Sequence, residues 1–166
     1  MPSIFKDVCL MSKTEKKYTL FMDTILNKVD VKGRVSVPAD YRALLEQKKT
    51  ELTAFPSFKL PCIECFTSEM MEKIANEMEA SFNPFSEEED DFSNSIFAQA
   101  KEFSFDSTGR ITLTEKLLSH AKITDQALFV GKGKTFQIWN PRIYEEQNKK
   151  RQLRISQQQF NIKRES

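Results

Sequence analysis

The chain has 166 residues, of which 39% are apolar and 30% are charged, and its formal net charge is +1 at pH 7. This length suits one compact core or two small units. No apolar run approaches the roughly 20 residues that cross a membrane, and the N-terminal segment lacks the unbroken apolar region of a signal peptide. The three cysteines, Cys9, Cys62 and Cys65, suggest no disulfide framework, which suits a reducing cytoplasm.

Charge is distributed unevenly along the chain. Residues 51–100 hold two lysines against eleven acidic residues, with a nearly continuous acidic run at 86–91. Residues 149–166 hold six basic residues against one acidic residue. Such segregation allows separate faces to have separate partners, although an acidic run is more commonly a solvated linker or the start of a helix.

The first predicted elements are two short strands joined by a tight turn. Residues 27–32 and 34–38 alternate apolar and polar side chains, which is the period of a half-buried strand. Gly33 lies between them, where a turn or bulge needs a residue that tolerates positive φ. Pro38 ends the second strand, and the helix formers of residues 39–49 predict a short helix.

Two more strands and a helix complete this unit. Residues 51–55 and 62–66 are predicted to pair across a proline-containing loop. Residues 67–82 have the pattern of an amphipathic helix that Thr67 or Ser68 caps. The segment 93–100 is predicted to belong to a connecting helix.

The second half of the chain repeats the order of the first. The pattern Asp-x-x-Gly-Arg occurs at residues 30–34 and again 76 positions later, at 106–110. A loop that is three residues longer in the first copy brings Phe66 into register with Trp139, which indicates a duplication. The repeated elements are expected as strands at 101–106, 110–114, 127–131 and 135–140, a helix at 115–121, and a helix from Pro141, which suits a first helical turn. The tail from Gln147 either extends this helix or is disordered.

Three stretches, "DVKGRVSVPADYR", "FDSTGRITL" and "LFVGKGKTFQIW", resemble the MraZ family, whose two halves are AbrB-like. The resemblance covers about residues 20–146. It implies a mainly β fold with short helices (α+β), namely a pseudo-two-fold, double-split, swapped-hairpin AbrB-like β-barrel made from two internal repeats. The implied organisation is an N-terminal extension at 1–20, repeat 1 at 21–82, an acidic linker and helix at 83–100, repeat 2 at 101–148, and a basic tail at 149–166.

The same resemblance implies a function. MraZ-like proteins are bacterial transcription regulators that assemble into closed rings and bind short direct repeats in the promoter of their own cell-division and cell-wall operon. For this chain it implies a cytoplasmic, nucleoid-associated DNA-binding repressor, whose partners are double-stranded DNA and further copies of itself. It implies no cofactor, membrane or small-molecule substrate. The alternative is a protein-binding scaffold or antitoxin-like module on the same barrel, without DNA contact.

The two Asp-x-x-Gly-Arg turns supply the candidate DNA-binding residues. Asp30 can accept hydrogen bonds from N–H groups of its turn. Arg34 can either pair with an acid or direct its guanidinium toward phosphate or guanine. We expect Arg34 to contact DNA, because Lys28 and Lys32 make the first turn the more basic one.

The remaining candidates are weaker. Arg110 is expected to form a turn-locking ion pair with Asp106, with DNA contact as the second interpretation. Arg42 either extends the basic surface or pairs with an acid. The candidate set is therefore Lys28, Lys32, Arg34, Arg42 and Arg110 for DNA, and Asp30, Gly33, Asp106 and Gly109 for the structure of the turns.

Other motifs favour structural roles. "GKGKT" at 131–135 is expected to be a hairpin turn, because Leu128 occupies the position at which a phosphate-binding loop needs glycine. Cys62 and Cys65 would point to opposite faces of a strand, which favours core thiols over a metal site. His120 is the only histidine and lies in no catalytic spacing, so neither an enzyme nor a metal centre is expected. Trp139 is expected in the core, with base stacking as the alternative.

Overall fold

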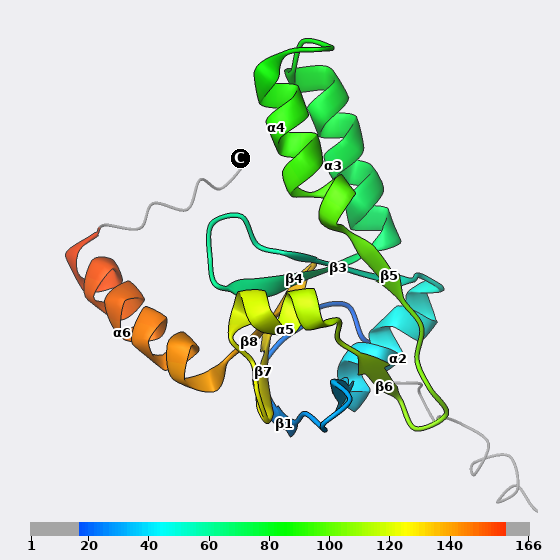
Figure 1. Ribbon diagram of the computed structural model, residues 1–166, viewed down its shortest axis with the longest axis vertical. Coiled ribbons are helices and arrows are strands. Elements are labelled where there is room, and N and C mark those ends of the chain that lie inside the picture. Colours follow the sequence, from blue (N-terminus) through cyan, green and yellow to red (C-terminus); the bar gives the residue numbers. More distant parts are fainter. Residues whose placement is uncertain (1–16, 159–166) are drawn as a thin grey trace, which may run out of the picture.

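The computed structural model describes residues 17–158, which form a mixed α+β fold (Figure 1). Within this range there are eight strands, five α-helices and one short 3-10 helix. The first half contains β1 (Thr24–Lys28), β2 (Arg34–Ser36), α2 (Ala39–Lys48), β3 (Leu52–Pro56), β4 (Cys62–Thr67) and α3 (Ser68–Ser81). The connection is α4 (Glu87–Ser95) and η1 (Phe97–Gln99). The second half contains β5 (Lys101–Phe103), β6 (Arg110–Thr112), α5 (Glu115–Ala121), β7 (Gln126–Gly131), β8 (Phe136–Trp139) and α6 (Pro141–Gln157).

The strands form two antiparallel sheets whose order is symmetric. One sheet has six strands in the order β1-β7-β8-β4-β3-β5, and the other is a two-stranded ribbon of β2 and β6. The strands β1, β3 and β4 of the first half are equivalent to β5, β7 and β8 of the second half. Exchanging each strand for its equivalent gives the same six-stranded order, read from the other edge of the sheet. The outer strands are exchanged between halves, since Ile25 of β1 pairs with Phe129 of β7 and Leu52 of β3 pairs with Phe103 of β5. Within residues 17–158 both sheets are open, so the closed barrel stays a prediction.

The core lies where the two halves meet, and aromatic side chains occupy its centre. Tyr41 of α2 lies edge-on to Phe21, with ring centroids 5.2 Å apart, and 4.9 Å from Phe136 of β8. Burial of each such ring stabilises the fold by roughly 1.5–3 kcal/mol. The Tyr41 hydroxyl donates to the carbonyl oxygens of Met22 and Asp23 within the core. Burial, followed by the nearby negative charge of Asp23, raises the pKa of Tyr41 to about 12.

Most helices begin at a side chain that accepts backbone N–H groups. At the starts of α3, α4 and α5, the hydroxyl oxygens of Thr67, Ser86 and Thr114 each accept a hydrogen bond from the backbone N–H group three residues further along the chain. Asn140 does the same for α6, with Pro141 in its first turn. Each cap of this kind stabilises its helix by about 1 kcal/mol. Of the two predicted caps, Thr67 and Ser68, the structure has Thr67, and the prediction that Pro141 lies in the first turn of the last helix is confirmed.

Several element boundaries differ from the prediction, for physical reasons. The first strand occupies residues 24–28 rather than 27–32, because Asp30 draws the following backbone into a turn. The acidic run begins α4, where its carboxylates lie near the positive end of the helix dipole. The connecting helix predicted at 93–100 is interrupted at Ile96, since α4 ends at Ser95 and a 3-10 turn follows. α6 continues to Gln157, so this part of the tail extends the helix.

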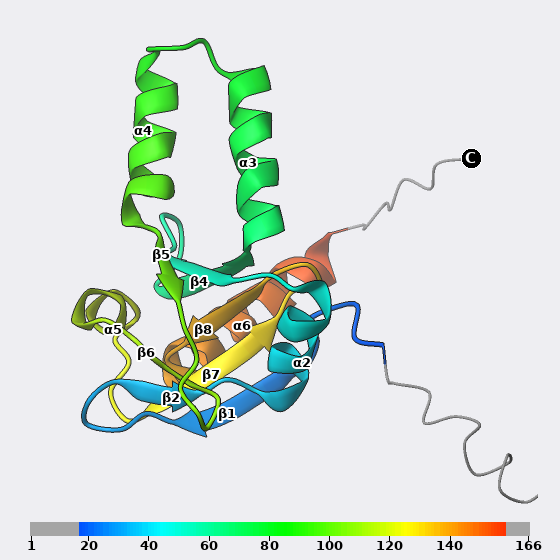
Figure 2. The ribbon, with the colours of Figure 1, turned by 90° about the vertical axis from the view of Figure 1, so that its right-hand side faces the viewer.

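The helices α3 and α4 form a hairpin that stands above one end of the six-stranded sheet (Figures 1 and 2). The ribbon β2–β6 lies toward the opposite end of the molecule (Figure 2). The predictions for residues 1–16 and 159–166, including the one for Cys9, concern residues outside the described part of the chain.

Candidate nucleic-acid interface

The first Asp-x-x-Gly-Arg turn is organised around the carboxylate of Asp30. Its Oδ1 atom accepts hydrogen bonds from the backbone N–H groups of Lys32 and Arg34, both at 2.9 Å. Its Oδ2 atom accepts from Nε of Arg34 at 2.5 Å. The backbone hydrogen bond from Arg34 is the main reason that the pKa of Asp30 is lowered. One carboxylate thus shapes the turn and orients the arginine.

The second turn repeats this arrangement. Oδ1 of Asp106 accepts from the N–H groups of Thr108 and Arg110 at 2.9 Å, and also from the Thr108 hydroxyl. Oδ2 accepts from Nε of Arg110 at 2.8 Å. The pKa of Asp106 is lowered well below its usual range, first by the backbone hydrogen bond from Arg110. The two turns are therefore chemically equivalent.

Each turn is also held by the other half of the chain. The N–H of Leu113 donates to the carbonyl of Gly33 at 2.8 Å, and the N–H of Val37 donates to the carbonyl of Gly109 at 3.2 Å. Both glycines have positive φ, +80° and +77°. A Cβ on Gly33 would lie 2.7 Å from the Leu113 carbonyl oxygen, which is closer than real contacts. A side chain at this position would disturb both the turn and its cross-half contact.

The pairing of β2 with β6 places both arginines on one face. Arg34 lies opposite Thr112, and Ser36 lies opposite Arg110. Between them Val35 and Ile111 are buried and point into the core. Because side chains alternate across a strand, the arginines and their two hydroxyl neighbours share the outer face. We call the outer face formed by Arg34, Ser36, Arg110 and Thr112 the ribbon face.

The arginines of the ribbon face keep donors available. Their side chains are 37% and 34% exposed. Each uses Nε for its aspartate, and within residues 17–158 neither makes a further side-chain hydrogen bond. The Nη groups can therefore donate to a phosphate or to the edge of a guanine. The ion pair and the DNA contact are therefore compatible in this geometry and need not be alternatives.

The other candidates occupy different positions. Lys28 ends β1 and Lys32 lies in the first turn, and both are exposed. Arg42 donates from Nε to the carbonyl of Val37 at 3.1 Å, and its guanidinium lies against Gly109. In residues 17–158 Arg42 pairs with no acid, and it instead links α2 to the second turn. The structure thus gathers Arg34 and Arg110, with the two lysines beside the first turn.

Sequence reasoning missed Ser36 and Thr112, the two hydroxyl side chains between the arginines on the ribbon face. The signal that could have found them is the duplication itself. Aligning residues 34–36 with 110–112 as antiparallel partners would have placed these side chains on one face.

Comparison with known proteins gives a consistent result. Residues 96–163 match a family model described as "MraZ protein, putative antitoxin-like". A protein of Rickettsia akari named Transcriptional regulator MraZ is 41% identical over 145 residues, which is 87% of this chain and 97% of the relative. Relatives of the same name from Pelagibacter ubique and Rickettsia canadensis are 44% and 45% identical over 127 residues, which is 76% of this chain and 81% and 85% of the relatives. The chain belongs to the MraZ family.

The remaining motifs of this MraZ-family chain lie in the core or in a hairpin turn, where they have structural roles. Cys62 and Cys65 are buried in separate apolar clusters, and burial raises the pKa of both thiols. The Trp139 indole is buried and donates to Gln137 at 2.9 Å. "GKGKT" closes the β7–β8 hairpin, with Gly133 at φ +85°. Among residues 17–158 no cluster of three or more metal-ligating side chains occurs, and none of the helices there is long and apolar enough to cross a membrane.

Proposed function

We propose that the chain is a sequence-specific DNA-binding transcription regulator, acting as a repressor, and that the ribbon face is its DNA-contacting surface. The observation that carries this proposal is that the pairing of β2 with β6 places Arg34 and Arg110 on one exposed face. An aspartate orients each guanidinium through Nε and leaves the Nη groups for DNA. The name of the relatives, Transcriptional regulator MraZ, supports the same function.

The ribbon face suits a groove of double-stranded DNA. A two-stranded ribbon fits the major groove, where arginine recognises guanine through O6 and N7. Ser36 and Thr112 can donate to phosphate or bases between the two arginines. Lys28 and Lys32 extend the surface at the first turn and add phosphate contacts that carry no sequence information.

The expected assembly accounts for the modest net charge of +1. We propose that the chain forms a closed ring in which several ribbon faces meet several direct repeats, in the promoter of its own cell-division and cell-wall operon. Each bound copy raises the effective concentration of the next, so overall affinity grows by about 10² or more without a strongly basic surface. In this proposal the protein acts in the cytoplasm at the nucleoid, with the two sheets closed as an AbrB-like barrel of two repeats, and without a cofactor or catalysis.

A protein-binding, antitoxin-like module is the second candidate, and the family model's description favours it. The acidic residues would support this function if they lay on the ribbon face, since they would repel DNA there. The α3–α4 hairpin that carries most of them lies toward the other end of the molecule (Figure 2). The DNA-binding proposal is therefore the better supported of the two.

The proposal predicts that Arg34→Ala weakens binding to the chain's own promoter fragment and relaxes its sequence preference. Loss of one bidentate guanine contact costs about 1–3 kcal/mol of discrimination. Arg110→Ala is expected to have a smaller effect, because Lys28 and Lys32 lie beside the first turn. A fluorescence anisotropy titration on native and scrambled promoter fragments measures both effects.

Lys73→Ala is the matched control, since Lys73 is an exposed base on α3, away from the ribbon face. It should bind like the parent. Unchanged affinity of Arg34→Ala, with the fold and assembly intact, would contradict the assignment of the ribbon face.

A further inference from the structure

Each Asp-x-x-Gly-Arg turn rests on the short helix of the other half of the chain, but the side chains that support the two turns differ. A Cβ on Gly33 would lie 3.2 Å from Cδ1 of Leu118 in α5. A Cβ on Gly109 would lie 2.5 Å from Cζ and 2.7 Å from Nε of Arg42 in α2, so the guanidinium covers this glycine. Arg42 and Leu118 are equivalent positions of the duplication, 76 residues apart. An arginine thus supports the second turn where a leucine supports the first.

The second turn has less support than the first from the residue that precedes its aspartate. Val29, before the first turn, is 7% exposed, bridges to Val35 and donates its N–H to the carbonyl of Asp125 at 2.9 Å. Its equivalent, Phe105, is 37% exposed, and within residues 17–158 it forms no such bridge and donates no backbone hydrogen bond. The position of the second turn therefore depends more on the contact at Gly109.

Arg42 is itself fixed by the first half of the chain. Its Nε donates to the carbonyl of Val37 at 3.1 Å, and the N–H of Val37 donates to the carbonyl of Gly109 at 3.2 Å. Val37 is fully buried, so this link has a rigid base. Arg42, Val37 and Gly109 thus form a closed set of contacts between the two halves.

The position of Gly109 determines the position of Arg110, to which it is directly bonded. The N–H of Gly109 donates to the carbonyl of Asp106 at 3.1 Å, and Oδ2 of Asp106 accepts from Nε of Arg110 at 2.8 Å. β6 has only three residues, so few other backbone contacts fix Arg110 relative to Arg34. A displacement of Gly109 would therefore move the aspartate and the arginine of the second turn together.

We propose that Arg42 is a positioning residue for DNA recognition, which holds the second turn so that Arg110 stays level with Arg34 on the ribbon face. In the first turn the apolar contacts of Leu118 and Val29 have this role. Within residues 17–158 the Nη groups of Arg42 make no hydrogen bond, but in this proposal Arg42 acts through Arg110 and not through a phosphate of its own. The inference rests on the proposed function and names a residue outside the ribbon face that the function needs.

Two substitutions in the full chain separate orientation from charge. Arg42→Gln keeps an N–H donor at the position of Nε, since both side chains have three carbons before that nitrogen, and it removes the charge. Arg42→Lys keeps the charge and places a methylene group at this position. Arg42→Lys should weaken binding to a fragment of the chain's own promoter by about fivefold or more, the lower end for loss of one arginine–base contact. Arg42→Gln should bind more tightly than Arg42→Lys, and the reverse order would overturn the inference.

A double-mutant cycle with Arg110→Ala tests whether Arg42 acts through that arginine, because residues that act together give non-additive effects. Arg42→Lys should cost little in the Arg110→Ala background and keep its full effect in the Arg34→Ala background. Additive effects with Arg110→Ala would assign Arg42 a separate contact. Arg42→Gln should also keep the parental salt slope of binding, whereas a slope lowered by about 0.9 would assign Arg42 to a phosphate and overturn the inference.

Hydrogen exchange of the free protein, followed by mass spectrometry, reports on the two turns without DNA. Arg42→Lys should speed exchange in residues 106–110 and leave residues 30–34 as in the parent, and Leu118→Ala should give the opposite pattern. Lys48→Ala, at an exposed base in the last turn of the same helix, is the matched control and should change neither turn. Faster exchange of both turns in Arg42→Lys, or of neither, would show that Arg42 does not position the second turn.

The same titrations separate this inference from the proposed function. If Arg110→Ala weakens promoter binding and Arg42→Lys does not, only the positioning role fails. If Arg110→Ala binds like the parent, the DNA contact of Arg110 fails and the positioning role fails with it, while Arg34 keeps its assignment. A parent that does not bind the fragment would overturn the proposed function and this inference together, whatever the exchange of the second turn shows.

Discussion

Asp30 and Asp106 use their two carboxylate oxygens for different tasks. One oxygen accepts backbone N–H groups and sets the turn, and the other fixes the Nε atom of an arginine. An exposed ion pair contributes little to stability by itself. Its value here is orientation, because a guanidinium held at Nε loses less freedom when its Nη groups bind DNA. Arg34→Lys would therefore keep the charge and lose the orientation.

The lowered pKa of Asp106 predicts a loss of stability in acid. Since the folded state favours the charged carboxylate, this stabilisation is present above the ordinary pKa of 3.8 and disappears as pH falls through the lower folded value. Urea unfolding between pH 6 and 2 should show a free energy of unfolding that falls below about pH 4. Asp106→Asn should make this fall shallower.

Unfolding at high salt distinguishes two possible causes of this pH dependence, the backbone hydrogen bond to Asp106 and the charge of Arg110. Because a backbone hydrogen bond is the largest contribution to the shift, the pH dependence should persist at about 1 M salt, where exposed ion pairs are screened. A pH dependence that vanishes in salt would instead assign the effect to the charge of Arg110.

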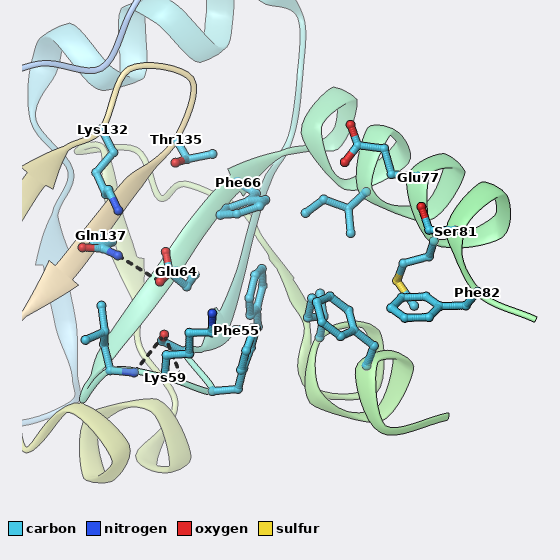
Figure 3. Close-up of a pocket in the computed structure, with 17 residues that line it drawn as sticks. Phe55, Lys59, Glu64, Phe66, Glu77, Ser81, Phe82, Lys132, Thr135 and Gln137 are labelled. Atoms are coloured by element: carbon cyan, nitrogen blue, oxygen red, sulfur yellow. Dashed lines mark hydrogen bonds between the residues drawn. The ribbon is translucent and has the colours of Figure 1, made fainter. Parts of the chain in front are cut away.

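At the scale of elements, local sequence patterns predicted most of the order of strands and helices along the chain. Alternation identified the strands, and the residues at Thr67 and Pro141 predicted two helix starts, because capping depends on a few neighbouring residues. Local patterns could not place Arg34 beside Arg110, since that depends on a pairing between strands 76 positions apart. Nor could local patterns predict the apolar groove between the α3–α4 hairpin and the strands β3, β4 and β8 (Figure 3), because its walls come from segments that are far apart in the sequence.

Asn140 connects two elements and provides a test of the second half. Its Oδ1 accepts from the N–H groups of Arg142 and Ile143, and its Nδ2 donates to the carbonyl of Lys122 after α5. Asn140→Ala should lower the free energy of unfolding by about 1–2 kcal/mol, through loss of a cap and of a hydrogen bond between elements. Thermal or urea unfolding measures this change.

Asn148→Ala on the same helix is the matched control, because Asn148 contacts only Arg151 of its own helix by hydrogen bond in the described residues. Its effect should stay within about 0.5 kcal/mol. Equal effects of the two substitutions would show that the Asn140 cap contributes nothing specific.

At the scale of the whole molecule, one ribbon face is a small and weakly charged contact. We expect the affinity for promoter fragments to rise with one, two and three intact repeats, by about 10² or more overall, because later contacts are made within one assembly. Titrations at several salt concentrations should show that Lys32→Ala lowers the salt slope by about 0.9 per lost phosphate contact. Equal affinity for one and three repeats would contradict multivalent binding and leave the ribbon face untouched.

The exchange of outer strands has a consequence for synthesis of the protein. β1 finds its partner β7 about 100 positions further along the chain, and β3 finds β5 only after α3 and α4 have been made. During translation β3 therefore waits for β5, at the start of the second half, and β1 waits until β7, near the end of that half, has left the ribosome. Such distant pairing slows folding, and waiting edges are sites at which nascent chains associate wrongly. The duplicated halves thus fold as one unit, although each carries a complete set of strands.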